Sequence, residues 1–135
     1  MSGCPTRTVR VEGSSLSPGV AHGDLLTLTP LRCAGKLKHG DLVVFNTGAK
    51  SIPLVKRIRA LPGDSFRLKE SHIIVDDQIV KNSAGQAYRL NDGQKNLLNL
   101  YVRDYESIIP ERALLVLGES TSGSIDSTRF GLISL

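Results

Sequence analysis

Short apolar runs bounded by Gly, Pro or Asp recur along this 135-residue chain. They cover residues 8–11, 24–30, 41–46, 52–61 and 65–68, with a last pair at 113–118 and 128–135. Runs of this length between turn-forming residues are typical of β-strands. Long segments with apolar residues at helical three-and-four spacing are missing. The sequence therefore predicts a mainly β, mostly antiparallel fold with little helix.

Two further segments fill in the architecture. Residues 72–75 (HIIV) and 78–81 (QIVK) flank Asp76 and Asp77, which predicts a hairpin with a two-residue turn. Residues 82–99 are polar and weakly patterned, and we expect a loop or an insertion between strands there. The chain length suits one domain spanning residues 1–135.

Composition limits the partners. The net charge is +4 but the charges are scattered, and three Tyr with three Phe are too few for the stacking platforms of single-strand binders, so we expect no nucleic-acid partner. No window approaches the roughly 18 apolar residues of a membrane span, and the chain is expected to be soluble as given. Cys4 and Cys33 lack metal-ligand spacing, and the sequence leaves their pairing open.

The tetrapeptide HGDL occurs twice, at residues 22–25 and 39–42. Two His and two Asp could form a metal site. A Gly-Asp turn that starts a strand on both occasions explains the repeat more simply, and we favour it. We therefore predict no metal and no cofactor.

The stretch LVKRIRALPGD, residues 54–64, contains an unusual lysine. Alternation along a strand places Lys56 on one face with Leu54, Ile58 and Ala60, all apolar. Burial of an ammonium group is costly unless the amine loses its proton. Lys56 can either extend to the surface, the commoner outcome, or serve as a neutral base.

A base of this kind needs a nucleophile, and the stretch VRVEGSSLSPG offers three candidates. A predicted strand ends near Gly13, and Ser14, Ser15 and Ser17 follow before Pro18. A serine after a strand end can point its hydroxyl away from the sheet, near backbone N–H groups that face an oxyanion. Serine-rich loops are more often turns, so no one of the three stands out on composition alone.

The same stretch resembles the GxSMxP box of the type I signal peptidases. Gly13, Ser15 and Pro18 match, and Leu16 stands where the family usually has Met. The segment VKRIRALPGD resembles the family's box with its lysine base, which falls on Lys56.

Two more boxes match as well, and along the chain the four boxes stand in the family's order. The turn after the lysine is formed by Pro62, Gly63 and Asp64, and HGDLVVF, which precedes the lysine box, resembles the family's GDxVVF strand. The segment GESTSGSIDSTRFG resembles the GDNxxxSxDSRxxG box, with Ser124 on the lysine-orienting serine and Asp126 on the structural aspartate. The resemblance spans residues 9–131 and implies a signal-peptidase-like fold, shared with the self-cleaving repressors.

The resemblance implies a Ser-Lys serine endopeptidase. Ser15 would attack the scissile carbonyl, neutral Lys56 would take its proton, and Ser124 would hold the amine in place. The Ser15 backbone N–H would donate to the oxyanion, whereas Gly13 has no side chain to add a second donor. The implied substrates are secreted preproteins with small residues at positions −1 and −3, cut at the outer face of the cytoplasmic membrane, with the membrane surface as a further partner.

Two departures from the family stand out. Thr128 occupies the place of the arginine that pairs with the aspartate, and Arg129 follows one residue later, on the opposite face of a regular strand. We expect either a bulge or another partner for Asp126. Family members also carry N-terminal membrane anchors, yet fourteen residues precede Ser15. A truncated catalytic domain is our favoured explanation, with a naturally anchorless relative as the other.

Three alternatives complete the interpretation. A peptidase that matures conjugative pilins fits the same motifs. A catalytically silent relative could act as a scaffold or binding protein. A self-cleaving repressor is disfavoured, because the residues that precede Ser15 contain no cleavable Ala-Gly or Cys-Gly segment and no DNA-binding domain. The sequence does not decide the oligomeric state.

Overall fold

The computed structural model describes residues 4–11, 23–45 and 54–135. Its strands there form three antiparallel sheets, β1–β2, β3–β4–β8–β9 and β5–β6–β7. The strands are β1 (Arg7–Arg10), β2 (Leu25–Leu28), β3 (Leu42–Phe45), β4 (Leu54–Ala60), β5 (Phe66–Lys69), β6 (His72–Val75), β7 (Gln78–Ile79), β8 (Ala113–Leu117) and β9 (Ile133–Ser134). The helices are η1 (Leu31–Cys33), α1 (Asp92–Asp104) and α2 (Ser127–Phe130). The mainly β prediction is confirmed.

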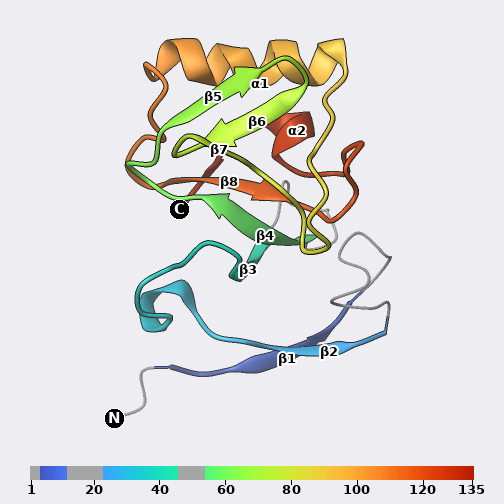
Figure 1. Cartoon of the computed structure of the whole chain (residues 1–135). Coiled ribbons are helices and arrows are strands. Elements are labelled where there is room, and N and C mark those ends of the chain that lie inside the picture. Colours follow the sequence, from blue (N-terminus) through green and yellow to red (C-terminus); the bar gives the residue numbers. More distant parts are fainter. Residues whose placement is uncertain (1–3, 12–22, 46–53) are drawn as a thin grey trace.

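The elements are stacked in layers (Figure 1). Helix α1 runs along one end of the molecule above β5 and β6, and the β1–β2 ribbon lies at the opposite end. The four-stranded sheet lies between them, with β4 at its centre between β3 and β8. A disulfide joins Cys4, before β1, to Cys33 at the end of η1, and so answers the question that spacing left open.

Both predicted turns are confirmed. Val75 pairs with Gln78, and the two residues between them, Asp76 and Asp77, have φ angles of 50° and 64°. These left-handed conformations suit a tight hairpin turn. Within the described residues of the HGDL repeats, Gly23 and Gly40 lie in turns and have φ angles near 90°, a region that favours glycine. Each turn leads directly into a strand.

Of the predicted loop or insertion over residues 82–99, the part from Asp92 onward is helical, because helix α1 begins there, between β7 and β8. Its N-terminus is fixed by a capping box between Asn91 and Gln94. Leu98 on its inner face is fully buried in the main core, and Tyr101 packs against that core. Burial of this face stabilises a helix that its polar outer residues make hard to recognise in the sequence.

The last predicted strand, residues 128–135, is also partly wrong. Residues Ser127–Phe130 form the short helix α2, and Gly131 ends it with a φ of 85°. Only Ile133–Ser134 pairs with β8, as strand β9. The helix therefore occupies the end of the last family-like box, residues 118–131.

A register shift divides the core along β4. Ile58 belongs to an apolar cluster with Leu114 and Val116, whereas Ala60 belongs to the main cluster with Leu115 and Leu117. The shift falls between Ile58 and Ala60, in their pairing with β8. The bulge thus lets one strand contribute side chains to two cores.

Candidate active site

Strand β4 buries Lys56, as the alternation of its residues predicted. The side chain is only 3% exposed, and Ile58, two residues further along the strand, is fully buried. The register shift after Ile58 places Ala60 in the other core, so the expectation that Ala60 shares the face of Lys56 is not met. Val43 of β3 is the backbone partner of Lys56. The lysine therefore does not extend to the surface, and its amine is shielded from solvent.

The amine contacts the serine of the last box. Lys56 Nζ donates to Ser124 Oγ at 3.5 Å, and Ser124 Oγ in turn donates to Asp126 Oδ2 at 2.8 Å. Burial lowers the pKa of the Lys56 amine, and the negative charge of Asp126 opposes this effect in part. The arrangement favours a neutral amine at lower pH than for a lysine in water.

Asp126 is fully buried, and its carboxylate accepts the hydrogen bonds that hold this region together. It caps helix α2, and its Oδ1 accepts hydrogen bonds from Thr128 N at 2.9 Å and from Thr128 Oγ1. Its Oδ2 also accepts from Gly118 N at 2.9 Å. Of the two expected solutions, the second is therefore the one observed: Thr128 replaces the arginine as a partner of the aspartate.

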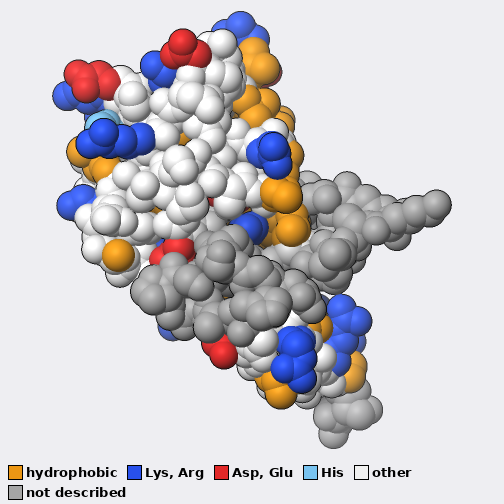
Figure 2. Space-filling model, turned by 90° about the vertical axis from the view of Figure 1, so that its right-hand side faces the viewer, with side chains coloured by type: hydrophobic (Ala, Val, Ile, Leu, Met, Phe, Trp, Pro, Cys, Tyr) orange, Lys and Arg blue, Asp and Glu red, His pale blue; other side chains and the backbone are white. Residues whose placement is uncertain are grey.

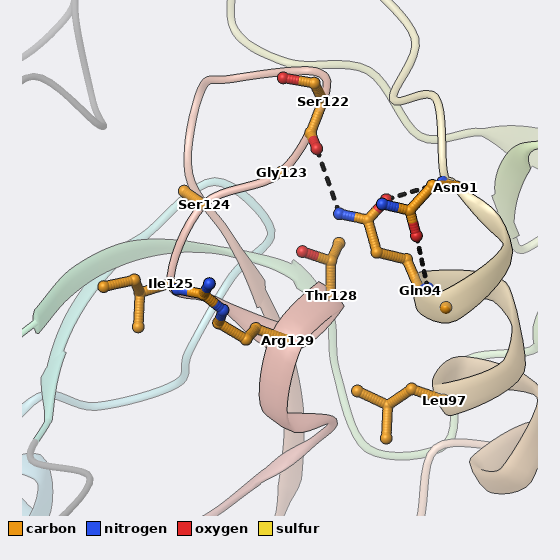
Figure 3. A pocket seen from close by; sticks show the side chains of 10 residues that line it. Asn91, Gln94, Leu97, Ser122, Gly123, Ser124, Ile125, Thr128 and Arg129 are labelled. Atoms are coloured by element: carbon orange, nitrogen blue, oxygen red, sulfur yellow. Dashed lines mark hydrogen bonds between the residues drawn. The ribbon is translucent and has the colours of Figure 1, made fainter.

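Arg129 shows why the strand-based argument about this box was wrong. The segment is helical, so facing is not set by strand alternation, and Arg129 lies on the exposed side of α2. It lines a pocket of about 620 Å³ together with Gln94, Leu97, Ile125 and Ser124 (Figure 3). The pocket brings solvent to the loop that carries Ser124, and Gln94 braces this loop by donating to Ser122 O at 3.1 Å.

The turn after β4 has the geometry that its residues predict. Gly63, which follows Pro62, has a φ of 88°, and its N–H donates to Ile109 O at 2.8 Å. Asp64 Oδ2 accepts from Leu61 N at 2.7 Å. The turn thereby fixes the end of the strand that carries Lys56.

An ion cluster on the other face of β4 was not predicted. Glu119 is buried, its Oε2 lies 3.3 Å from Arg59 Nη2 and 3.9 Å from Arg57 Nε, and its Oε1 accepts from Ser83 N at 2.8 Å. Burial by itself would raise the pKa of Glu119, but the Ser83 hydrogen bonds and Arg59 together lower it. The only sequence signal is that Glu119 stands where the box GDNxxxSxDSRxxG has its first Asp.

Other predicted site residues lie outside the described part of the chain. These are Gly13, Ser15, Leu16 and Pro18. The metal hypothesis for the HGDL repeats included His22, which also lies outside the described part of the chain.

Charged side chains of both signs are spread over the visible face of the molecule, next to a strip of apolar ones (Figure 2). In the described residues, no helix is long and apolar enough to cross a membrane.

Comparison with known proteins gives a consistent result. The family model "Signal peptidase, peptidase S26" matches residues 2–135. Signal peptidase I P of Bacillus subtilis subsp. natto is 30% identical over 119 residues, which are 87% of this chain and 63% of that protein. Signal peptidase I of Bacillus licheniformis is 30% identical over 91% of this chain and 67% of its own length. The Staphylococcus aureus (strain COL) protein named inactive signal peptidase IA is 27% identical over 91% of this chain and 68% of its own length. The chain thus spans about two thirds of the length of these relatives.

Proposed function

Because the chain belongs to the signal peptidase family, peptidase S26, we propose that it is a serine endopeptidase that removes signal peptides from secreted preproteins. The observation that carries this proposal is the buried Lys56 amine in contact with Ser124. Burial of a lysine without a carboxylate in direct contact is costly, and it is explained by a need for a neutral amine.

We assign the chemical roles as follows. The Ser15 hydroxyl attacks the scissile carbonyl carbon while neutral Lys56 takes its proton. Lys56 then gives this proton to the leaving amine, and an acyl-enzyme remains on Ser15. In the second half of the reaction, Lys56 takes a proton from water while the water oxygen attacks the acyl carbon. The bond to Ser15 Oγ then breaks, Lys56 returns the proton to this oxygen, and the signal peptide leaves with a free carboxylate. Ser124 acts as a positioning residue that orients Lys56 Nζ.

The substrates are inferred to carry small residues, typically Ala, at positions −1 and −3 of the cleavage site. We place the protein at the outer face of the cytoplasmic membrane. The disulfide between Cys4 and Cys33 supports this placement, because such bonds persist mainly in oxidising compartments outside the cytoplasm.

A catalytically silent signal-peptidase-like protein is the second candidate. The Staphylococcus aureus relative named inactive signal peptidase IA shows that family resemblance alone does not establish activity. The contact between Lys56 and Ser124 favours the active form here, since a scaffold has no need of a buried amine.

A peptide-cleavage assay in detergent separates the two candidates. The substrate carries an Ala-x-Ala site, and wild type is compared with Ser15→Ala and Lys56→Ala. We expect cleavage after the second Ala by wild type and a loss of at least about a thousandfold in each variant. Equal rates in all three proteins, or no cleavage by any of them, would remove the peptidase assignment.

A further inference from the structure

Three side chains that can bind a metal converge away from Lys56. His39 lies in the turn before β3, Asp64 in the turn after β4, and Asp76 in the turn between β6 and β7. One nitrogen or oxygen atom from each lies within 4.8 Å of the other two. Segments that are far apart in the sequence therefore bring one imidazole and two carboxylates to a single point.

Backbone hydrogen bonds hold the two carboxylates in place. Leu61 N donates to Asp64 Oδ2 at 2.7 Å, and Ser65 N donates to Asp76 Oδ1 at 3.0 Å. Among the described residues, no hydrogen bond reaches the second oxygen of either group. Each carboxylate thus has one oxygen bonded to the backbone and a second oxygen free to bind a cation.

The imidazole is equally well placed. Gly40 N donates to Ile58 O at 2.7 Å, which ties the turn that carries His39 to strand β4. His39 Nε2 lies 2.6 Å from Asp64 Oδ2, and its side chain is 52% exposed, so an ion can approach from solvent.

We propose that His39, Asp64 and Asp76 form a structural zinc site on this surface, with water completing the coordination. One imidazole and two carboxylates suit Zn²⁺, whereas Mg²⁺ and Ca²⁺ prefer sets made only of oxygen. This set differs from the His and Asp residues of the HGDL repeats, because only His39 belongs to both.

The geometry requires a small local change. Ligand bonds of about 2.0–2.2 Å place two tetrahedral ligand atoms about 3.4 Å apart. The 2.6 Å separation of His39 and Asp64 is shorter, so the ion replaces their hydrogen bond, and any proton on His39 Nε2 is released to solvent. Asp76 moves toward the pair by rotation of an exposed side chain.

A bound ion would connect two sheets of the fold. The ion links the β3–β4 edge of the central sheet to the β5–β6–β7 sheet, across the turn that ends the Lys56 strand. Zinc binding then stabilises the folded chain, because the unfolded chain holds no such set of ligands. The site takes no part in peptide cleavage, and it can be tested whether or not the chain is a peptidase.

Calorimetric titration of the untagged, EDTA-treated chain with ZnCl₂ tests the site, and thermal unfolding with and without the metal provides the second readout. The test variants are His39→Ala and Asp76→Asn. Matched controls are His72→Ala, a histidine outside the cluster, and Asp77→Asn, whose carboxylate neighbours Asp76 but pairs with Arg67.

We expect one Zn²⁺ per chain, a rise of several degrees in the melting temperature, and no response to MgCl₂ or CaCl₂. Binding should weaken at least about tenfold in His39→Ala and Asp76→Asn and stay unchanged in both controls. The proposal is overturned if wild type binds no zinc, which would leave His39 and Asp64 as an ion pair only, or if the test variants bind as tightly as wild type.

Discussion

Lys56 Nζ lies 3.5 Å from Ser124 Oγ, although the two residues are 68 positions apart in the chain. Ser124 is itself held by Asp126, at 2.8 Å. The amine of a flexible side chain is thus oriented by a hydroxyl that belongs to a rigid, buried anchor. This relationship links the strand that supplies the base to the box near the C-terminus.

Replacement of Ser124 should misplace the base without removing it. We expect Ser124→Ala to lower kcat roughly ten- to a hundredfold with little change in KM, because a misdirected amine transfers protons poorly. Peptide-cleavage kinetics measure both constants. Ser122→Ala, in the same loop, is the control and should behave like wild type. A Ser124→Ala variant with full kcat would contradict the positioning role.

Lys56 should cost stability. We expect Lys56→Met to raise the free energy of unfolding at pH 7 by about 1–3 kcal/mol while it abolishes cleavage, because an apolar side chain of similar length suits the site better than an amine. Chemical denaturation measures the change. A less stable variant would show that the amine contributes net binding energy to the fold.

The difference in the free energy of unfolding between Lys56→Met and wild type should depend on pH in a defined direction. The pKa of Lys56 is lower in the folded than in the unfolded chain, so the unfolded chain binds more protons. The loss of stability caused by the buried amine is therefore complete at pH values below the pKa of Lys56 in the folded chain. It disappears as pH rises through 10.5, the pKa of Lys56 in the unfolded chain. The advantage of Lys56→Met should shrink over that range, and an advantage that grows with pH would contradict the burial argument.

Thr128, rather than Arg129, should matter to the fold. Thr128 is 2% exposed, and its side chain donates to Asp126. We expect Thr128→Val to cost about 1–2 kcal/mol, because Asp126 loses a buried donor. Arg129→Ala, on the exposed side of α2, should stay within about 0.5 kcal/mol of wild type. Chemical denaturation of both variants measures the two losses of stability. A larger loss in Arg129→Ala than in Thr128→Val would indicate that Arg129, rather than Thr128, is the important partner of Asp126.

The stability that Glu119 contributes to the fold should be lost in acid. Its pKa is lowered in the fold, so its contribution is present above the unfolded value of 4.5 and is lost as pH falls through the folded value. We expect Glu119→Gln to be about 1–3 kcal/mol less stable than wild type at pH 7, with the difference narrowing below pH 4.5. Unfolding curves at several pH values test this, and a constant difference would exclude the ionised form as the cause.

The strands were predictable because their signals are local. Alternation along β4 placed Lys56 on a buried face, and Asp76 with Asp77 specified a hairpin turn. Helix α1 also has a local signal in the sequence. Asn91 and Gln94 form a capping box, and buried Leu98 lies one helical turn after Gln94. Polar residues around this motif concealed it.

The remaining features depend on folding of the whole chain. The pairing of Cys4 with Cys33 requires that η1 return to the start of β1, which no spacing rule encodes. The exchange of Arg for Thr128 could be understood only once the segment proved to be helical. Similarly, contacts of His39 with Asp64 arise from sheet topology and leave no trace in the sequence.

The pH dependence of kcat/KM for an Ala-x-Ala peptide tests the central claim, that Lys56 acts as an uncharged base, most directly. Only the deprotonated amine can take a proton from Ser15, so we expect the rate to rise toward alkaline pH and to level off below the usual lysine pKa of 10.5. A flat profile between about pH 6 and 9 would contradict Lys56 as the base.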